Sequence, residues 1–202
     1  ALCPLHRAAG LRRIVASTYQ AVSGAGRQGL EELESQTRAY AAGEPMEVST
    51  FQYQIAFNLI PHIDAFSEDD YTKEELKMRN ESRKILHCPD LRVSSTCVRV
   101  PVLRSHSESL TIETERPLSP DGARAILRDA PGVKVLDAPA EKVYPMPLFA
   151  SDQDLIHVGR IRRDESAEDP TRGLVLWVCG DQIRKGAAAN AVQIAEIVWK
   201  NK

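Results

Sequence analysis

Residues 11–26 read LRRIVASTYQAVSGAG, and this stretch indicates how the chain folds. Residues 11–22 contain many β-branched and apolar residues, so they predict a strand that ends where the small residues 23–26 begin. Polar side chains are frequent along it: Arg12, Arg13, Ser17, Thr18 and Gln20. A strand with so many polar residues is expected to turn one face toward solvent or toward a binding site.

Three glycines after this strand, Gly24, Gly26 and Gly29, have the G-x-G-x-x-G spacing of a dinucleotide-binding turn. Glu44 stands about twenty residues after Gly24, where such a motif has its acidic residue. The first strand of a dinucleotide-binding domain, however, is buried on both faces and nearly all apolar. Residues 11–22 do not fit that description, and no strand–helix–strand repetition follows. We interpret the glycines as an ordinary turn between a strand and a helix.

Helix and strand signals alternate along the rest of the chain. Helices are predicted at residues 30–42, 72–86, 119–128 and 185–200, the second with a capping box of Thr72 and Glu75. Strands are predicted at residues 91–100, 107–115, 133–136, 155–162 and 173–179, with a long loop over 139–154. The runs 91–100 and 107–115 are expected to be neighbouring strands. The pattern favours one α+β domain over residues 1–202, with helices on a mixed, largely antiparallel sheet.

Composition narrows the class of function. The 202 residues include 26 Lys and Arg against 28 Asp and Glu, a net charge of −2. No basic cluster with interleaved aromatic residues predicts nucleic-acid binding, and no apolar run is long enough to predict a membrane span. The sequence shows no secretory signal, and the cysteines and histidines have no metal-ligand spacing. We expect a cytoplasmic protein with free thiols, no metal and a small-molecule substrate.

Two strand residues are candidates for substrate contact. Gln20 is either an exposed amide at a strand end or a hydrogen-bonding group for a substrate carbonyl. In the second case the small residues 23–26 would let a ligand come close to the backbone. Arg99 lies in an otherwise apolar run, so it either faces solvent, forms a structural ion pair or holds a substrate carboxylate through two parallel hydrogen bonds.

Three further residues are candidates. A straight strand would separate Arg99 from His106 by roughly 23 Å, so the two can share a site only if the chain turns between them. Pro101 favours such a break. Glu74 and Lys77 lie on one face of the predicted helix 72–86. They can be read in two ways. Either they form a solvated charge pair, or the acidic Glu74 binds a substrate ammonium and the basic Lys77 binds a substrate anion.

Several blocks of the sequence, taken together and in their order along the chain, resemble the aspartate-β-semialdehyde dehydrogenases. They are STYQAVSGAG at residues 17–26, QIAFNLIP at 54–61, EELKM at 74–78, TCVRVP at 96–101 with His106, VGRIR at 158–162, RKGAA at 184–188 and NAVQIAE at 190–196. The resemblance implies a fold like the carboxy-terminal domain of glyceraldehyde-3-phosphate dehydrogenase. It also implies a homodimer.

The family reduces β-aspartyl phosphate with NADPH, through a cysteine thioester, to aspartate semialdehyde and phosphate. The resemblance implies that His106 is the acid/base, that Gln20 orients the acyl group and that Arg99 grips the substrate carboxylate. Glu74 would meet the substrate amine, and Lys77 would meet a phosphate or carboxylate. The residues expected near NADP are Gln182, Ser23 and Gly24, although the family usually has Asn where this chain has Gln182.

The nucleophile of the family lies in an Asn-Pro-Asn-Cys motif, which these 202 residues do not contain and Cys3 does not replace. We expect that motif, and the NADP-binding half, to precede Ala1 in a longer protein. The final helix, about 185–201, is expected to pack toward that half, and the 202 residues alone to be inactive. Two alternatives remain open. One is another acyl-phosphate reductase, such as N-acetyl-glutamyl-phosphate reductase, and the other is a non-catalytic dimerisation module.

Overall fold

The structure is a computed structural model that describes residues 1–67 and 69–200. Its elements are α1 (Leu2–Ala9), β1 (Leu11–Ala21), η1 (Val22–Ala25), α2 (Gly26–Ala42), α3 (Lys73–Ile85), β2 (Arg92–Val100), β3 (His106–Thr114), α4 (Pro120–Arg128), β4 (Val133–Val135), η2 (Pro139–Glu141), α5 (Pro147–Ala150), β5 (Ile156–Arg163), β6 (Gly173–Gly180), η3 (Arg184–Ala188) and α6 (Ala189–Lys200).

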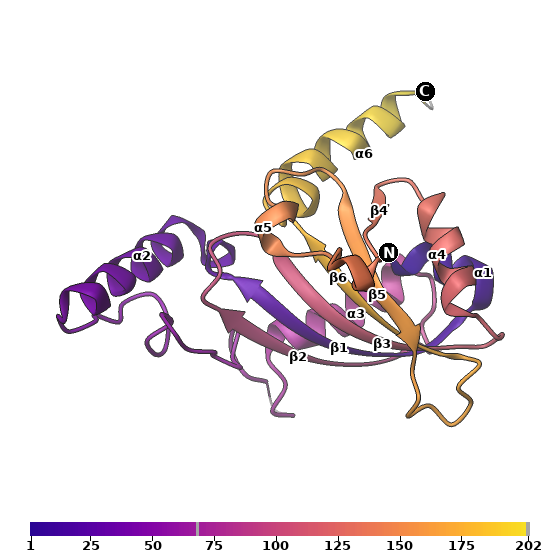
Figure 1. Ribbon diagram of the computed structural model, residues 1–202, viewed down its shortest axis with the longest axis horizontal. Helices are drawn as coiled ribbons and strands as arrows, with labels where there is room; N and C mark the ends of the chain where they lie inside the picture. The colour runs from indigo at the N-terminus through magenta and orange to yellow at the C-terminus, as the bar shows by residue number, and fades with distance from the viewer. Residues whose placement is uncertain (68, 201–202) are drawn as a thin grey trace.

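Six strands form one mixed sheet in the order β2–β1–β3–β6–β5–β4 (Figure 1). The pairs β1–β3, β3–β6 and β5–β6 are antiparallel, and β1–β2 and β4–β5 are parallel. The predicted α+β class with a largely antiparallel sheet is therefore confirmed. The prediction that the strands at 91–100 and 107–115 are neighbours is wrong, because β1 lies between them. Gln20 is opposite Arg99 on one side of β1, and Tyr19 is opposite Ser107 on the other.

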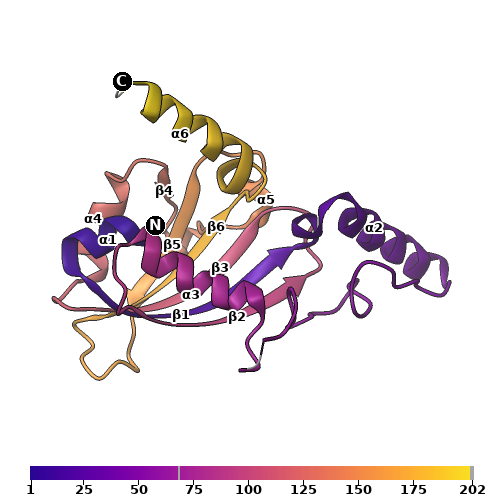
Figure 2. The same cartoon turned by 180° about the vertical axis from the view of Figure 1, so that it is seen from behind.

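Helices α1, α3 and α4 lie on one face of the sheet (Figure 2). The main core forms beneath them from apolar residues of α1, α4 and the central strands, including Leu5, Leu127, Ile112 and Leu176. Strand residues alternate between the two faces, so Thr18 and Gln20 point to the helical side and Tyr19 to the opposite side. The polar residues at the end of β1 therefore lie beside the core, on the side where helices can surround them.

Local signals placed several elements correctly. Helix α3 has the predicted capping box, in which Thr72 accepts from the Glu75 amide and Glu75 accepts from the Thr72 amide. Helix α2 ends before Gly43, as predicted, and the backbone of Gly43 has the left-handed conformation. The helix begins at Gly26 rather than at residue 30. The predicted loop 139–154 contains the short elements η2 and α5. Helix α1 was not predicted.

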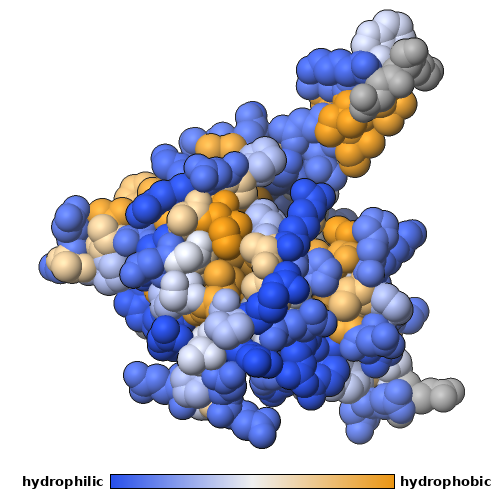
Figure 3. Space-filling model, turned by 90° about the vertical axis from the view of Figure 1, so that its right-hand side faces the viewer, coloured by the Kyte–Doolittle hydropathy of each residue, from blue (hydrophilic) through white to orange (hydrophobic). Residues whose placement is uncertain are grey.

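Helices α2 and α6 project away from the sheet in different directions (Figure 1). Helix α6 has hydrophobic side chains on its surface, among them Val192 and Trp199, which is 78% exposed (Figure 3). The predicted helix 185–201 corresponds to η3 and α6, and its last residue lies outside the described part of the chain. Among the described residues, no helix is long and apolar enough to cross a membrane.

Candidate active site

The parallel register of β1 and β2 places Gln20 beside Arg99 on the helical face of the sheet. The Gln20 side chain accepts a hydrogen bond from Thr18 Oγ1 at 3.0 Å and donates from Nε2 to Glu74 Oε1 at 3.3 Å. The other oxygen of Glu74 is 3.2 Å from Lys77 Nζ. Burial lowers the pKa of Lys77, but the charge and hydrogen bond of Glu74, together with the charges of Glu81 and Asp64, raise it above its usual value. A chain of polar contacts thus joins the end of β1 to the first turns of α3.

Arg99 is almost completely buried at the end of β2. Its Nη1 donates to the carbonyl oxygen of Ala21 at 2.7 Å, and its Cζ lies 5.8 Å from the centre of the Phe51 ring. Burial lowers the pKa of Arg99, and the nearby charge of Glu74 opposes that shift. No carboxylate forms an ion pair with Arg99 within residues 1–67 and 69–200. The interpretations of Arg99 as a solvent-facing residue or an ion-pair residue are therefore not supported, and four of its five N–H groups remain for other partners.

The chain turns between Arg99 and His106, and this turn allows the two side chains to lie in one site. After β2 it crosses the end of β1, where Val22 and Ser23 donate their amides to the carbonyls of Val102 and Leu103. His106 then begins β3, and its Nδ1 accepts a hydrogen bond from the Ala21 amide at 3.1 Å. Burial and the positive charge of Arg99 lower the pKa of His106 to about 4. At neutral pH its imidazole is uncharged and carries the proton on Nε2.

Gly24 is the point at which the two side chains meet. A Cβ atom on Gly24 would lie 2.7 Å from Arg99 Nη1 and 3.3 Å from His106 Nε2, so a side chain there would displace the Arg99 guanidinium. A Cβ atom on Gly29 would lie 2.5 Å from the carbonyl oxygen of Val22. Close approach of the backbone thus requires glycine at position 29, and Gly24 leaves space for the side chains of Arg99 and His106.

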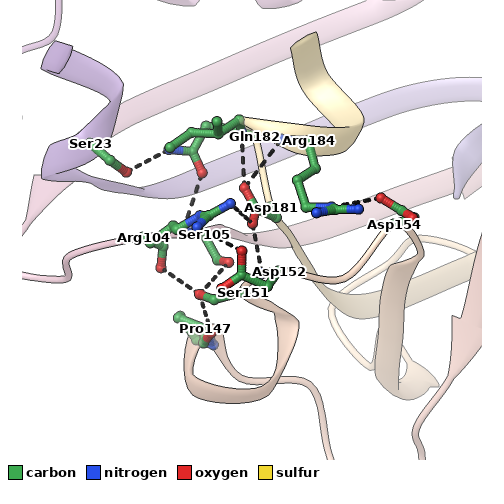
Figure 4. Close-up of polar contacts among 11 residues, drawn as sticks. Ser23, Arg104, Ser105, Pro147, Ser151, Asp152, Asp154, Asp181, Gln182 and Arg184 are labelled. Atoms are coloured by element: carbon green, nitrogen blue, oxygen red, sulfur yellow. Dashed lines mark hydrogen bonds and ion pairs between the residues drawn. The ribbon is translucent and has the colours of Figure 1, made fainter. Parts of the chain in front are cut away.

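Behind this site, Gln182 connects two segments that are distant in the sequence (Figure 4). Its Nε2 donates to Ser23 Oγ at 2.7 Å, and its Oε1 accepts from the Ser105 amide at 3.2 Å. The neighbouring Asp181 is completely buried and accepts hydrogen bonds from the amides of Asp152 and Ile183. It also forms an ion pair of 2.8 Å with Arg104.

Asp181, Arg104 and Ser105 were not singled out from the sequence. The only local signal was an aspartate just before a predicted helix, a residue type that often accepts hydrogen bonds from the amides that follow it. Arg184 contacts Asp154 at 2.7 Å, so this cation has a partner within the chain.

Two of the chain's four cysteines are buried and do not offer a thiolate. Cys97 is fully buried beside Thr18, and burial raises its pKa to about 11. Cys179 is also fully buried with a raised pKa. A neutral, buried thiol is a poor nucleophile. Among the described residues, no group of three or more His, Cys, Asp or Glu side chains could hold a metal ion.

The structure therefore brings six of the candidate residues into one connected region, and Ser23 and Gln182 border it. Five kinds of polar group lie at one end of three adjacent strands: a guanidinium, an ammonium, a carboxylate, an amide and a neutral imidazole. Such a set can hold a small molecule with both acidic and basic groups and can move a proton next to it. Fold and site together define an α+β domain with a cluster of polar and charged side chains at one end of its sheet.

The comparisons with known proteins specify this class further. The semialdehyde dehydrogenase, dimerisation domain family matches residues 2–185, and the chain belongs to that family. Aspartate-semialdehyde dehydrogenase of Aquifex aeolicus is 54% identical over 99% of the chain, and that of Bacillus subtilis is 47% identical over 99%. The chain spans 58% and 59% of the lengths of these two relatives.

Solved structures agree with this assignment. The crystal structure of aspartate semialdehyde dehydrogenase II from Vibrio cholerae complexed with ASA has a TM-score of 0.94 and 43% identity. That match covers 98% of this chain and 58% of the Vibrio chain. The enzyme from Candida albicans, solved with NADP, has a TM-score of 0.69 at 24% identity and supports the fold alone.

Proposed function

We propose that residues 1–202 form the substrate-binding and dimerisation part of a cytoplasmic, NADP-dependent aspartate-semialdehyde dehydrogenase. The enzyme would convert β-aspartyl phosphate to aspartate semialdehyde and phosphate, a step toward lysine, threonine and methionine. One observation carries the proposal: in a chain of this family, Arg99 and His106 converge on Gly24 with Gln20 beside them.

The charges of the site fit an aspartyl substrate. We assign the substrate carboxylate to Arg99, whose free N–H groups can form two parallel charge-assisted hydrogen bonds. The substrate ammonium is assigned to Glu74, and an anionic group, phosphate or carboxylate, to Lys77. Gln20 would orient the acyl group through its amide, which Thr18 and Glu74 already hold in place.

His106 would act as the acid/base next to the reacting carbon. In the family, a cysteine thiolate attacks the acyl phosphate, phosphate leaves and a thioester remains, which is then reduced. Because Nδ1 of His106 is occupied by the Ala21 amide, its Nε2–H is the group available to the acyl oxygen. A neutral imidazole with a depressed pKa can serve as such a donor without carrying charge.

The residues next to His106 suit part of a nicotinamide cofactor. A cavity of about 220 Å³ opens there, lined by side chains that include Gln182 and Lys185. Gln182 keeps one N–H and one lone pair free after its contacts with Ser23 and Ser105. Gln182, Ser23 and Gly24 would therefore hold the cofactor at this end of the site. NADPH, when bound, supplies the hydride.

The opposite face of the sheet suits a second copy of the chain. Tyr19 and Trp177 contact each other there with tilted rings whose centres are 5.2 Å apart, beside a hollow of about 490 Å³ lined by residues that include Ser109 and Arg160. Because Tyr19 points away from Gln20, a homodimer built through this face leaves the site accessible. The exposed hydrophobic side chains of α6 would pack toward the NADP-binding half.

The test is an assay of the longer protein that contains this chain. We expect NADP- and phosphate-dependent oxidation of aspartate semialdehyde and little oxidation of N-acetyl-glutamate semialdehyde. The 202-residue chain is the matched control, and it should be inactive because it contains no Asn-Pro-Asn-Cys motif. A preference for the acetylated substrate would favour N-acetyl-glutamyl-phosphate reductase. Inactivity of the longer protein toward both would favour a non-catalytic dimerisation module.

A further inference from the structure

A carboxylate in the projecting helix α2 is buried although it forms no ion pair with a residue of the described chain. Glu32 is only 6% exposed. Its Oε2 accepts hydrogen bonds from the Ser49 amide at 3.3 Å, from Ser49 Oγ at 3.0 Å and from the Thr50 amide. A buried charge is stable when several donors surround it, and here those donors come from one turn of the chain.

Gln36, one helical turn further along α2, holds the same segment at both of its ends. Its Nε2 donates to Glu32 Oε1 at 2.9 Å and to the carbonyl oxygen of Glu47 at 2.8 Å. Its Oε1 accepts from the amides of Ile55 and Ala56, each at 2.9 Å. All four hydrogen-bonding positions of this amide are therefore used. Residues 47–56, here called the 47–56 segment, are fixed to α2 by two side chains.

The 47–56 segment presents Phe51 to the candidate site. Phe51 follows Thr50 directly, and the centre of its ring is 5.8 Å from Arg99 Cζ. The absence of a side chain on Gly29 makes room for it, since a Cβ there would lie 3.1 Å from Phe51 Cζ. The Arg99 guanidinium thus lies over an aromatic ring that belongs to the segment fixed to α2.

We propose that Glu32 is a positioning residue for Arg99: by holding the 47–56 segment to α2, it keeps Phe51 against the guanidinium. The ring then limits a carboxylate to the edge of Arg99, where two parallel hydrogen bonds can form. The identity of that ligand rests on the proposed function. The series of contacts from Glu32 through Ser49 and Thr50 to the segment that carries Phe51 does not.

Glu32→Gln replaces an oxygen that accepts several hydrogen bonds with an amide that cannot accept all of them. In the longer enzyme we expect KM for aspartate semialdehyde to rise about fivefold or more, roughly the loss of one hydrogen bond, while kcat changes less. Glu34→Gln is the matched control, because Glu34 is exposed on the same helix and, among the residues that the structure describes, pairs only with Arg38 at 3.6 Å. A fall in kcat without a rise in KM would overturn the proposal.

A second measurement does not depend on the substrate. In the 202-residue chain, the NMR signals of the Arg99 guanidinium report on the ring next to it. Phe51→Leu defines the signals without the ring, and Glu32→Gln should move them in that direction. Ser49→Ala, which removes one donor and is gentler on the fold, should produce a smaller shift of the same sign, and Glu34→Gln none.

The kinetic and NMR measurements test the proposed function and the positioning role of Glu32 separately. Unchanged Arg99 signals in both Glu32→Gln and Ser49→Ala, with a clear shift in Phe51→Leu, would show that Glu32 does not position the ring. If the wild-type longer protein does not act on aspartate semialdehyde, the proposed function fails. The NMR series still decides whether Glu32 controls Phe51 and Arg99.

Discussion

The side-chain nitrogen of Gln182 donates to the hydroxyl of Ser23 at 2.7 Å, although the two residues are 159 positions apart in the chain. Because the oxygen of the same amide accepts from Ser105, one side chain ties the turn after β1 to the residue before His106. The geometry of the site thus depends on a contact made by the segment that follows the last strand.

Gln182→Asn shortens this side chain by one methylene, so it cannot keep both hydrogen bonds without movement of the backbone. We expect the free energy of unfolding to fall by about 1 kcal/mol, the usual net value of one hydrogen bond. Denaturant unfolding of the 202-residue chain measures it. Gln153→Asn, at an exposed position, is the control and should be neutral. Equal stabilities of the two variants would mean that Asn satisfies both partners.

Arg99→Lys keeps the charge but loses the planar fork that fits a carboxylate. We expect KM for aspartate semialdehyde to rise at least about tenfold in the longer enzyme, roughly the effect of weakening a charged hydrogen bond. Because Arg99 also donates to Ala21, a loss of stability of about 1 kcal/mol should accompany it. Steady-state kinetics combined with thermal unfolding separates the two effects. An unchanged KM would show that Arg99 does not hold the substrate carboxylate.

His106→Asn removes the imidazole but leaves an amide of similar shape. If His106 manages the proton, kcat of the longer enzyme should fall by about 10²–10⁴-fold while KM changes little. Stopped-flow measurement of the first turnover shows whether the chemical step is the one slowed. A variant whose KM rises while kcat is retained would place His106 in substrate binding instead.

The low pKa of His106 also predicts how stability depends on pH. Above about pH 6.5 the side chain is neutral in both the folded and the unfolded chain. Between about pH 6.5 and 4, His106 binds a proton in the unfolded chain but not in the folded chain. The free energy of unfolding therefore falls as the pH falls. The loss is about 3 kcal/mol at most and is absent from His106→Asn. Denaturant unfolding of both proteins from pH 7.5 to 4 would contradict this if their curves stayed parallel.

Local signals in the sequence were sufficient for part of the fold. The capping box of α3 and the left-handed Gly43 depend only on residues a few positions apart, and both are present. The order of the strands is not a local property. Residues 91–100 and 107–115 are close in sequence, which favours a hairpin, but β1 pairs with both and separates them.

The candidate site shows the same limit. The residue types and the break at Pro101 indicated that Arg99 and His106 could come together. That they meet at Gly24 depends on the chain crossing the end of β1, which no spacing reveals. Glu32 and Gln36 were not recognised, because on a helix such residues usually face solvent. Their role depends on donors in a segment that has no regular structure of its own.

The position of β1 between β2 and β3 in the sheet has a consequence for synthesis of the chain. This eleven-residue strand comes early, whereas its two neighbours end at Val100 and Thr114. During translation β1 therefore leaves the ribosome well before either partner exists, with its backbone groups unpaired on both edges. Pairing across such long separations is slow, and exposed strand edges attract other chains. Chaperones that cover a nascent strand should raise the yield of this protein more than that of one built from consecutive hairpins.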